Sequence, residues 1–118
     1  DYTNGDPTKA PELFSNMLTA HPEITALFPI EGTSVAAAIT AVKERGLTGK
    51  VNVVANDLTD DHRAAIEDGT LLGVGEQGWC EAGTKSVEAV KSLSEGETVP
   101  AFIPTTSTFY DSSNLPAK

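Results

Sequence analysis

The sequence predicts an α/β fold in which helices flank a parallel β-sheet, giving three layers. Short apolar runs rich in β-branched residues alternate with segments of helical periodicity between residues 10 and 93. Three of the four helical segments are followed by glycine, at Gly46, Gly69 and Gly96, as helix C-termini commonly are, and His21-Pro22 closes the first. Strands and helices that alternate at this spacing form right-handed βαβ units. Such units build a parallel sheet with helices on both faces.

The first half of the chain is predicted to hold two helices with a strand between them. The first helix is indicated by an apolar stripe at helical spacing, formed by Ala10, Leu13, Phe14, Met17 and Leu18. Residues 24–28 are a short apolar run bounded by Pro29, as expected of a buried strand that is leaving its sheet. Thr33 or Ser34 is expected to cap a second helix, which ends before Gly46.

The second half continues the alternation of strands and helices. Thr59 is expected to cap a short helix through Ile66, and Asp60 and Asp61 suit the positive end of that helix's dipole. The other predicted elements are strands at residues 50–55 and 71–75, a longer helix at residues 80–93 and an extended segment at residues 99–109. The tail DSSNLPAK shows no periodicity and is expected to be loose.

Composition and charge exclude several classes of function. The chain has 118 residues, of which 39% are hydrophobic, as expected for one globular domain. Eight basic and seventeen acidic residues give a formal net charge of −9, which disfavours binding to nucleic acid or anionic membranes. The apolar runs are far shorter than the roughly 20 residues that span a bilayer. Cys80, His21 and His62 lack the spacing of metal ligands, so we interpret all three as structural or surface residues and expect no metal or other cofactor.

Polar side chains follow each of the predicted strands. Glu31 comes after the first strand, Asn56 and Asp57 after the second, and Glu76 and Gln77 after the third. Because the carboxyl ends of parallel strands meet at one edge of a sheet, we expect these side chains to converge where open sheets bind ligands. Several hydrogen-bonding groups that include carboxylates suit a neutral, hydroxyl-rich ligand better than an anion.

Three segments together carry a family resemblance: NGDPTKAPELFSNMLTAHPEITALF, VNVVANDLTDDHRAAIEDGTLLGVGEQ and GETVPAFIPTTSTF. They resemble the type I periplasmic solute-binding proteins, the ribose-binding-protein-like group that shares its fold with the sensor domains of lac-repressor-family regulators. The resemblance covers essentially the whole chain but only the later part of the family. It implies that residues 1–78 are a partial C-terminal ligand-binding lobe. It also implies that the crossover helix, strand and tail of residues 79–118 pack towards an N-terminal lobe outside the chain.

The resemblance further implies a function and a binding site. An intact protein of this kind is exported to the periplasm or another extracytoplasmic space, closes two lobes over one sugar-like solute and docks on an ABC permease. Asp57 matches an aspartate that accepts hydrogen bonds from sugar hydroxyls, and Gln77 matches a glutamine that bridges ligand and hinge. Glu31-Gly32 stands where the family has Asn-Asp, and Trp79 is a candidate for stacking on a sugar.

Each candidate site residue also has a structural alternative. In these alternatives, Asp57 forms an Asx turn that leads into the Thr59 cap, and Gln77 satisfies backbone groups of its loop. Glu31 is then a solvated acid at a helix start, and Trp79 is a packing residue beside the crossover.

Three other functions remain as alternatives at this point. The first is the effector-sensing domain of a lac-repressor-type regulator, which an upstream helix-turn-helix would favour, whereas an upstream secretory signal would favour the transport protein. The second is a glycosidase that uses two of Glu31, Asp57 and Glu76 as its carboxylate pair. The third is a dinucleotide-binding enzyme, because residues 73–78 match GxGxxG. The negative charge of Glu76 and Glu81 beside a pyrophosphate argues against the third.

Overall fold

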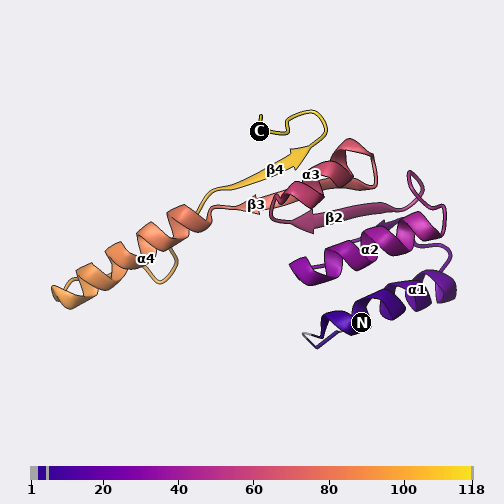
Figure 1. Ribbon diagram of the computed structural model, residues 1–118. Helices are drawn as coiled ribbons and strands as arrows, with labels where there is room; N and C mark the ends of the chain where they lie inside the picture. The colour runs from indigo at the N-terminus through magenta and orange to yellow at the C-terminus, as the bar shows by residue number, and fades with distance from the viewer. Residues whose placement is uncertain (1–2, 5, 118) are drawn as a thin grey trace.

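The computed structural model describes residues 3–4 and 6–117 and confirms an α/β fold with a sheet flanked by helices. Figure 1 shows the order of the elements along the chain. The helices are α1 (Ala10–Ala20), α2 (Gly32–Glu44), α3 (Asp60–Glu67) and α4 (Trp79–Ser94), and a 3-10 turn, η1 (Pro7–Lys9), precedes α1. The strands are β1 (Ala26–Leu27), β2 (Asn52–Asn56), β3 (Leu71–Gln77) and β4 (Ser107–Asp111).

The strands of the described residues form one four-stranded sheet in the order β1-β2-β3-β4. β1, β2 and β3 run parallel, as the βαβ spacing predicts, whereas β4 pairs antiparallel with β3. The chain leaves the carboxyl end of β3 through α4, returns alongside that helix and re-enters the sheet where it left (Figure 1). Ser107 therefore pairs with Gln77, and β4 must run in the opposite direction.

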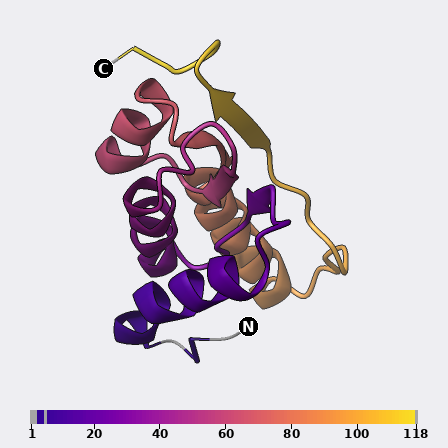
Figure 2. The ribbon, with the colours of Figure 1, turned by 90° about the vertical axis from the view of Figure 1, so that its right-hand side faces the viewer.

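The hydrophobic core lies between the sheet and the first three helices. Figures 1 and 2 show α2 and α3 against one face of the sheet, with α1 beside α2. The core includes Val53, Ala55, Leu71 and Val74 of the strands and Val35, Ala38 and Val42 of α2. The α2 positions recur every three or four residues, as one face of a helix does. Val54, whose side chain points to the other face of β2, is only half-buried.

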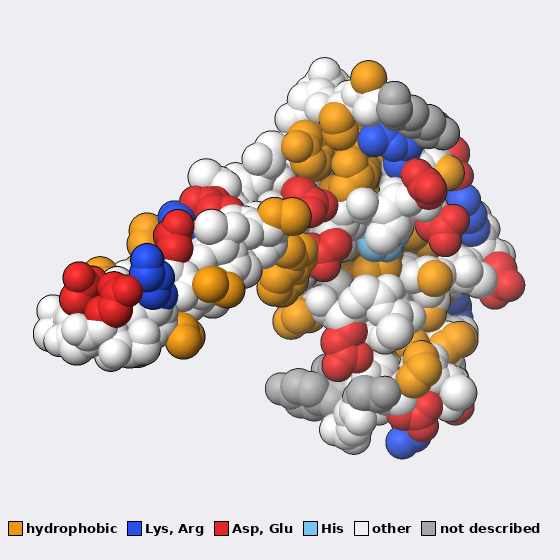
Figure 3. Space-filling model, turned by 60° about the vertical axis from the view of Figure 1, so that its left-hand side comes forward, with side chains coloured by type: hydrophobic (Ala, Val, Ile, Leu, Met, Phe, Trp, Pro, Cys, Tyr) orange, Lys and Arg blue, Asp and Glu red, His pale blue; other side chains and the backbone are white. Residues whose placement is uncertain are grey.

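Helix α4 and the return segment of residues 95–106 form an arm that stands out from the rest of the molecule (Figures 1 and 3). None of the residues of α4 is buried, and Val87 and Val90 are 70% and 66% exposed. Glu81 ties the return segment to the helix, because its carboxylate accepts hydrogen bonds from Thr106 N and Oγ1 at 2.8 and 2.6 Å. The Lys85 ammonium and these Thr106 donors lower the pKa of Glu81 to about 2.

The predicted cap of α2 is wrong. The helix begins at Gly32, and its N-cap is Glu31, whose extended backbone leads directly from the strand exit into the first turn. Thr33 and Ser34 therefore already lie inside the first turn, and Ser34 is buried.

The C-terminal tail is also more ordered than the sequence predicts. Asn114 Nδ2 donates to the Phe109 carbonyl oxygen at 2.9 Å, and Arg63 Nη1 donates to the Pro116 carbonyl oxygen at 2.8 Å. Leu115 packs against the core. These contacts join the tail to β4 and α3, which a sequence without periodicity could not reveal.

Candidate ligand-binding site

Asp57 directly follows β2 and has a left-handed backbone, with φ of 61°. Non-glycine residues rarely adopt this conformation, although aspartate and asparagine tolerate it better than most. The Asp57 N–H donates to the Gly75 carbonyl oxygen at 3.0 Å, and the Asp57 carbonyl oxygen accepts from His62 Nδ1 at 2.6 Å. The next amide, Leu58 N–H, donates to Glu76 Oε2 at 2.6 Å. Three hydrogen bonds therefore hold the backbone at this turn.

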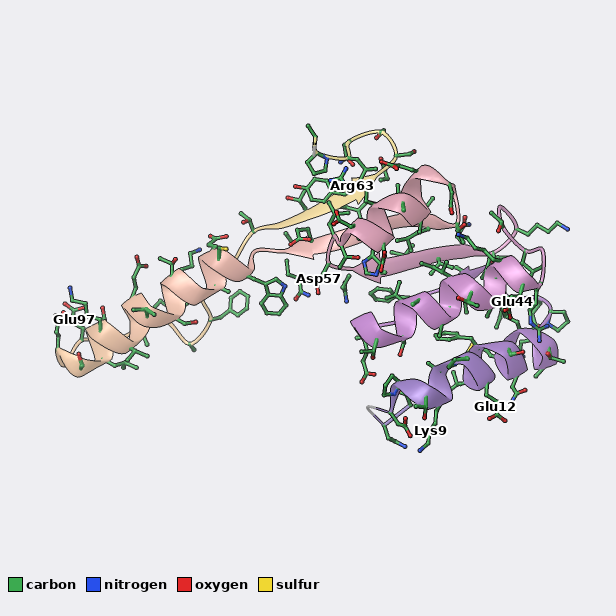
Figure 4. All side chains as sticks on the ribbon, viewed as in Figure 1. Lys9, Glu12, Glu44, Asp57, Arg63 and Glu97 are labelled. Atoms are coloured by element: carbon green, nitrogen blue, oxygen red, sulfur yellow. The ribbon has the colours of Figure 1, made fainter. Side chains whose placement is uncertain are left out.

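The Asp57 carboxylate joins the ends of β2 and β3. Its Oδ1 accepts hydrogen bonds from Gln77 Nε2 at 3.2 Å and from Trp79 Nε1 at 3.1 Å. Figure 4 shows Asp57 at the edge of the sheet, on the side from which the arm departs. The structure therefore brings three of the predicted site residues into one hydrogen-bonded cluster.

The Asx-turn alternative for Asp57 is wrong. Among the described residues, the carboxylate accepts no hydrogen bond from the backbone of residues 58–60 and bonds across the sheet edge instead. Thr59 does cap α3 as predicted, because its Oγ1 accepts from His62 N at 3.1 Å. The cap and the carboxylate thus serve separate purposes, although only two positions separate them in the sequence.

Glu31 lies apart from this cluster. Its Oε2 accepts a hydrogen bond from Thr3 Oγ1 at 3.1 Å, and it borders an apolar hollow beside β1. Among the described residues, the exits of β1 and β2 are linked by Asn56, whose Nδ2 donates to the Ile30 carbonyl oxygen at 3.5 Å. The expected convergence is therefore direct for β2 and β3 and indirect for β1.

A hollow of about 510 Å³ lies between α2 and α3 and reaches Asp57 at one end. Ala36, Ile39 and Ala65 line its length. At the other end, Lys43 Nζ lies 2.6 Å from Asp68 Oδ2, and this ion pair joins the two helices. The Lys43 ammonium and the Thr70 donors lower the pKa of Asp68 to about 2.

Sequence reasoning did not assign His62 and Glu76 to the support of Asp57. It treated His62 as a structural or surface residue, and the structure shows the buried, structural case, with 7% of the residue exposed. Both residues contact the backbone around Asp57, as described above, rather than its side chain. The sequence offered only the positions of these residues as a signal for this role. His62 lies in the first turn of the helix that follows Asp57, and Glu76 lies in the next strand.

The GxGxxG match does not form a phosphate-binding loop. Residues 73–77 belong to β3 and pair with β4 along their length. Gly73 lies against the Phe109 ring, so closely that a β-carbon placed there would come within 2.5 Å of Phe109 Cζ. Close packing between strands, rather than approach to a pyrophosphate, therefore accounts for this glycine.

The described part of the chain contains no group of three or more His, Cys, Asp or Glu side chains arranged to hold a metal ion. None of its helices combines the length and the apolar character that a membrane crossing requires.

Comparison with known proteins identifies the family. The model of the periplasmic binding protein domain matches residues 1–98. The ribose import binding protein RbsB of Salmonella typhimurium is 34% identical over 99 residues, which are 84% of this chain and 33% of RbsB. The RbsB of Escherichia coli is 33% identical over the same length. The chain belongs to the periplasmic binding protein family.

This membership places the chain among binding proteins rather than enzymes, so neither the glycosidase nor the dinucleotide hypothesis is supported. The chain spans about a third of the length of the curated relatives it matches. Those relatives are named as import binding proteins, which does not favour the regulator alternative.

Solved structures agree on the fold. GanP, a glucose-galactose binding protein from Geobacillus stearothermophilus, superposes with a TM-score of 0.88 at 19% identity, over 98% of this chain and 41% of GanP. An ABC transporter solute-binding protein from Agrobacterium vitis, solved with bound D-fucose, gives 0.82 at 24% identity, over 97% of this chain and 39% of that protein. At these identities the likeness shows the fold alone.

Proposed function

We propose that this chain is the C-terminal part of an exported, two-lobed solute-binding protein, which binds a sugar or sugar-like solute for an ABC importer. The curated relatives are named for ribose import, and related folds were solved with bound D-fucose and D-arabinose. The acidic charge of the chain agrees with an uncharged ligand. The partners are then the solute, the other lobe and a membrane permease.

The observation that carries this proposal is the cluster of Asp57, Gln77 and Trp79. The two donors occupy Asp57 Oδ1, and among the described residues no donor reaches Oδ2. A carboxylate offers about four acceptor positions, so Asp57 retains capacity for ligand hydroxyls. Trp79 is 59% exposed, and its bonded indole N–H fixes one edge of a ring on which a sugar can stack.

The arm supplies the second part of the proposal. Its exposed Val87, Val90 and Leu93 give it an apolar surface that the body of this lobe does not cover. We assign residues 1–78 to the ligand-binding lobe and residues 79–118 to the crossover that packs towards the other lobe, although β4 pairs with β3. Closure of two lobes over the ligand then shifts the population towards the closed form, because only that form makes both sets of contacts.

Calorimetric titration of the whole protein with D-ribose, D-allose, D-arabinose and D-fucose tests the proposal. We expect at least one sugar to bind with a Kd of roughly micromolar or tighter, which corresponds to about −8 kcal/mol. A failure of every sugar to bind contradicts the ligand class. A secretory signal upstream of residue 1 supports export, whereas a helix-turn-helix there contradicts it.

Glu31 has a separate test because it lies outside the cluster. If Glu31 contacts the solute, Glu31→Gln changes which sugar is preferred and leaves folding intact, since the side chain is exposed and Thr3 is its one hydrogen-bond donor among the described residues. Its matched control is Glu12→Gln on the exposed face of α1 (Figure 4). Equal affinities across pentoses, hexoses and polyols for the wild type and Glu31→Gln show instead that Glu31 only begins α2.

A further inference from the structure

We propose that His62 and Glu76 are positioning residues, which hold Asp57 in its left-handed conformation and thereby aim its carboxylate at the ligand. The proposal deepens the binding role of Asp57 and rests on it. Neither side chain touches the carboxylate itself. Each instead holds one side of the peptide group that follows Asp57.

The geometry of that peptide group carries the argument. Its carbonyl oxygen accepts from His62 Nδ1 at 2.6 Å, and its amide, Leu58 N–H, donates to Glu76 Oε2 at 2.6 Å. A peptide group bonded at both ends cannot rotate without losing one of these hydrogen bonds. The peptide group before Asp57 is also held, because the Asp57 N–H donates to the Gly75 carbonyl oxygen at 3.0 Å. With the peptide groups on both sides of its Cα held, φ and ψ of Asp57 are fixed, and so is the direction in which its side chain leaves the backbone.

A clamp is needed here because the backbone conformation is unfavourable on its own. Asp57 has φ of 61°, a conformation that glycine adopts freely but that costs a residue with a β-carbon free energy. Without the clamp, the backbone relaxes towards negative φ and carries the carboxylate away from Gln77 and Trp79. Strained backbone persists only where its surroundings hold it in place.

His62 is itself held for this purpose. It is buried, its own amide is bonded by the Thr59 cap, and its Nδ1 must carry a proton because a carbonyl oxygen only accepts. Glu76 is half-buried on β3, one residue before Gln77. The clamp therefore comes from two rigid elements, α3 and β3, on either side of the turn.

The test compares variants that remove each bond with variants that retain it. In the whole protein, His62→Ala and Glu76→Ala remove a donor and an acceptor, whereas His62→Asn and Glu76→Gln keep one in a similar place. The matched controls are His21→Ala and Glu12→Ala, two exposed positions away from Asp57. Binding of D-ribose, or of whichever sugar of the panel binds the wild type, is measured well below each melting temperature.

We expect the alanine variants to weaken binding about tenfold or more, the lower end of the effect that loss of contacts behind metal-binding residues has. The conservative variants should restore most of that loss, and the controls should leave the Kd unchanged. Alanine variants that melt earlier but keep the wild-type Kd show a merely structural role and overturn the proposal. Because any variant could unfold, only variants with a cooperative melt are compared. Each of the two positions can supply a folded variant independently of the other.

An NMR measurement separates this proposal from the proposed function. The indole N–H of Trp79 donates to Asp57 Oδ1 at 3.1 Å, so its resonance reports the position of the carboxylate without any sugar. Loss of one peak in Trp79→Phe assigns that resonance. We expect it to move in His62→Ala and Glu76→Ala, and an unchanged position in both overturns the clamp. If the wild type binds none of the sugars while the resonance still moves, the sugar-binding function fails and the clamp stands.

Discussion

Replacement of Asp57 by three different residues separates its carboxylate from its backbone. The left-handed φ of 61° means that alanine retains strain at this position, whereas glycine removes both the strain and the side chain. Asparagine tolerates the conformation and keeps one acceptor oxygen but loses the charge. Affinity and stability should therefore rank these variants differently.

The expected magnitudes follow from the contacts. A hydrogen bond to a charged group contributes about 1.5–3 kcal/mol, so losing one ligand bond weakens the Kd roughly 10- to 150-fold. Asp57→Ala and Asp57→Gly should show this loss equally, because both lack the carboxylate. Asp57→Asn should lose less, since a neutral hydrogen bond that contributes about 1 kcal/mol remains. In stability, Asp57→Ala should fall below Asp57→Gly by about 1 kcal/mol, the cost of a left-handed alanine.

Calorimetric titration of the whole protein gives the affinities, and urea denaturation without sugar gives the stabilities. Asp57→Asn is the control for the backbone, because it should melt close to the wild type. Affinity that follows the stability ranking, with wild-type binding in Asp57→Gly, would falsify the assignment of the carboxylate to the ligand. It would leave Asp57 as a residue chosen only for its turn.

Three further outcomes follow from the structure. The pKa of Asp68 is lowered to about 2 beside Lys43, so the pair stabilises above the unfolded pKa, near 4, and loses that effect towards pH 2. Asp68→Asn should thus cost under about 1 kcal/mol near pH 6, since the pair is half-exposed, and the difference from wild type in urea denaturation should shrink near pH 3. Gly73→Ala should destabilise by about 1–3 kcal/mol, because its β-carbon would lie 2.5 Å from the Phe109 ring; Gly83→Ala, which meets nothing within 4 Å, should stabilise α4 in the same melts. The isolated chain should associate as its concentration rises in sedimentation experiments, because none of the residues of α4 is buried and its apolar side chains are exposed. A monomer at every concentration contradicts this prediction.

Local sequence signals account for most of the fold. The apolar stripe of α1, the Thr59 cap and the glycines that end the helices are properties of short segments, and the structure shows each of them. The antiparallel direction of β4, by contrast, is not a property of a short segment. It depends on where the arm returns the chain to the sheet, and no residue of β4 encodes that position locally. The same pairing explains why β3 continues to Gln77.

The site was only partly accessible from the sequence for a similar reason. The exits of β2 and β3 could be placed at one edge from topology. The family resemblance, rather than topology, singled out Asp57 and Gln77 among the polar residues at those exits. The local signal for the left-handed turn is Asp57 itself, a residue type that tolerates this conformation but does not require it. The contact of Glu76 with Leu58 N depends on the β2–β3 register, which shifts between Val53 and Val54. Such a shift cannot be read from either strand alone.

The last three residues of β3 all hold the turn after β2, and this has a consequence for the arm. The Gly75 carbonyl oxygen accepts from Asp57 N, Glu76 accepts from Leu58 N, and Gln77 donates to the Asp57 carboxylate. Neighbouring side chains of a strand point to opposite faces of the sheet. Glu76 and Gln77 therefore hold the turn from opposite faces. Helix α4 starts two residues later at Trp79, whose indole bonds the same carboxylate oxygen. Any displacement of that carboxylate by a ligand must therefore be accommodated at the first residue of the arm.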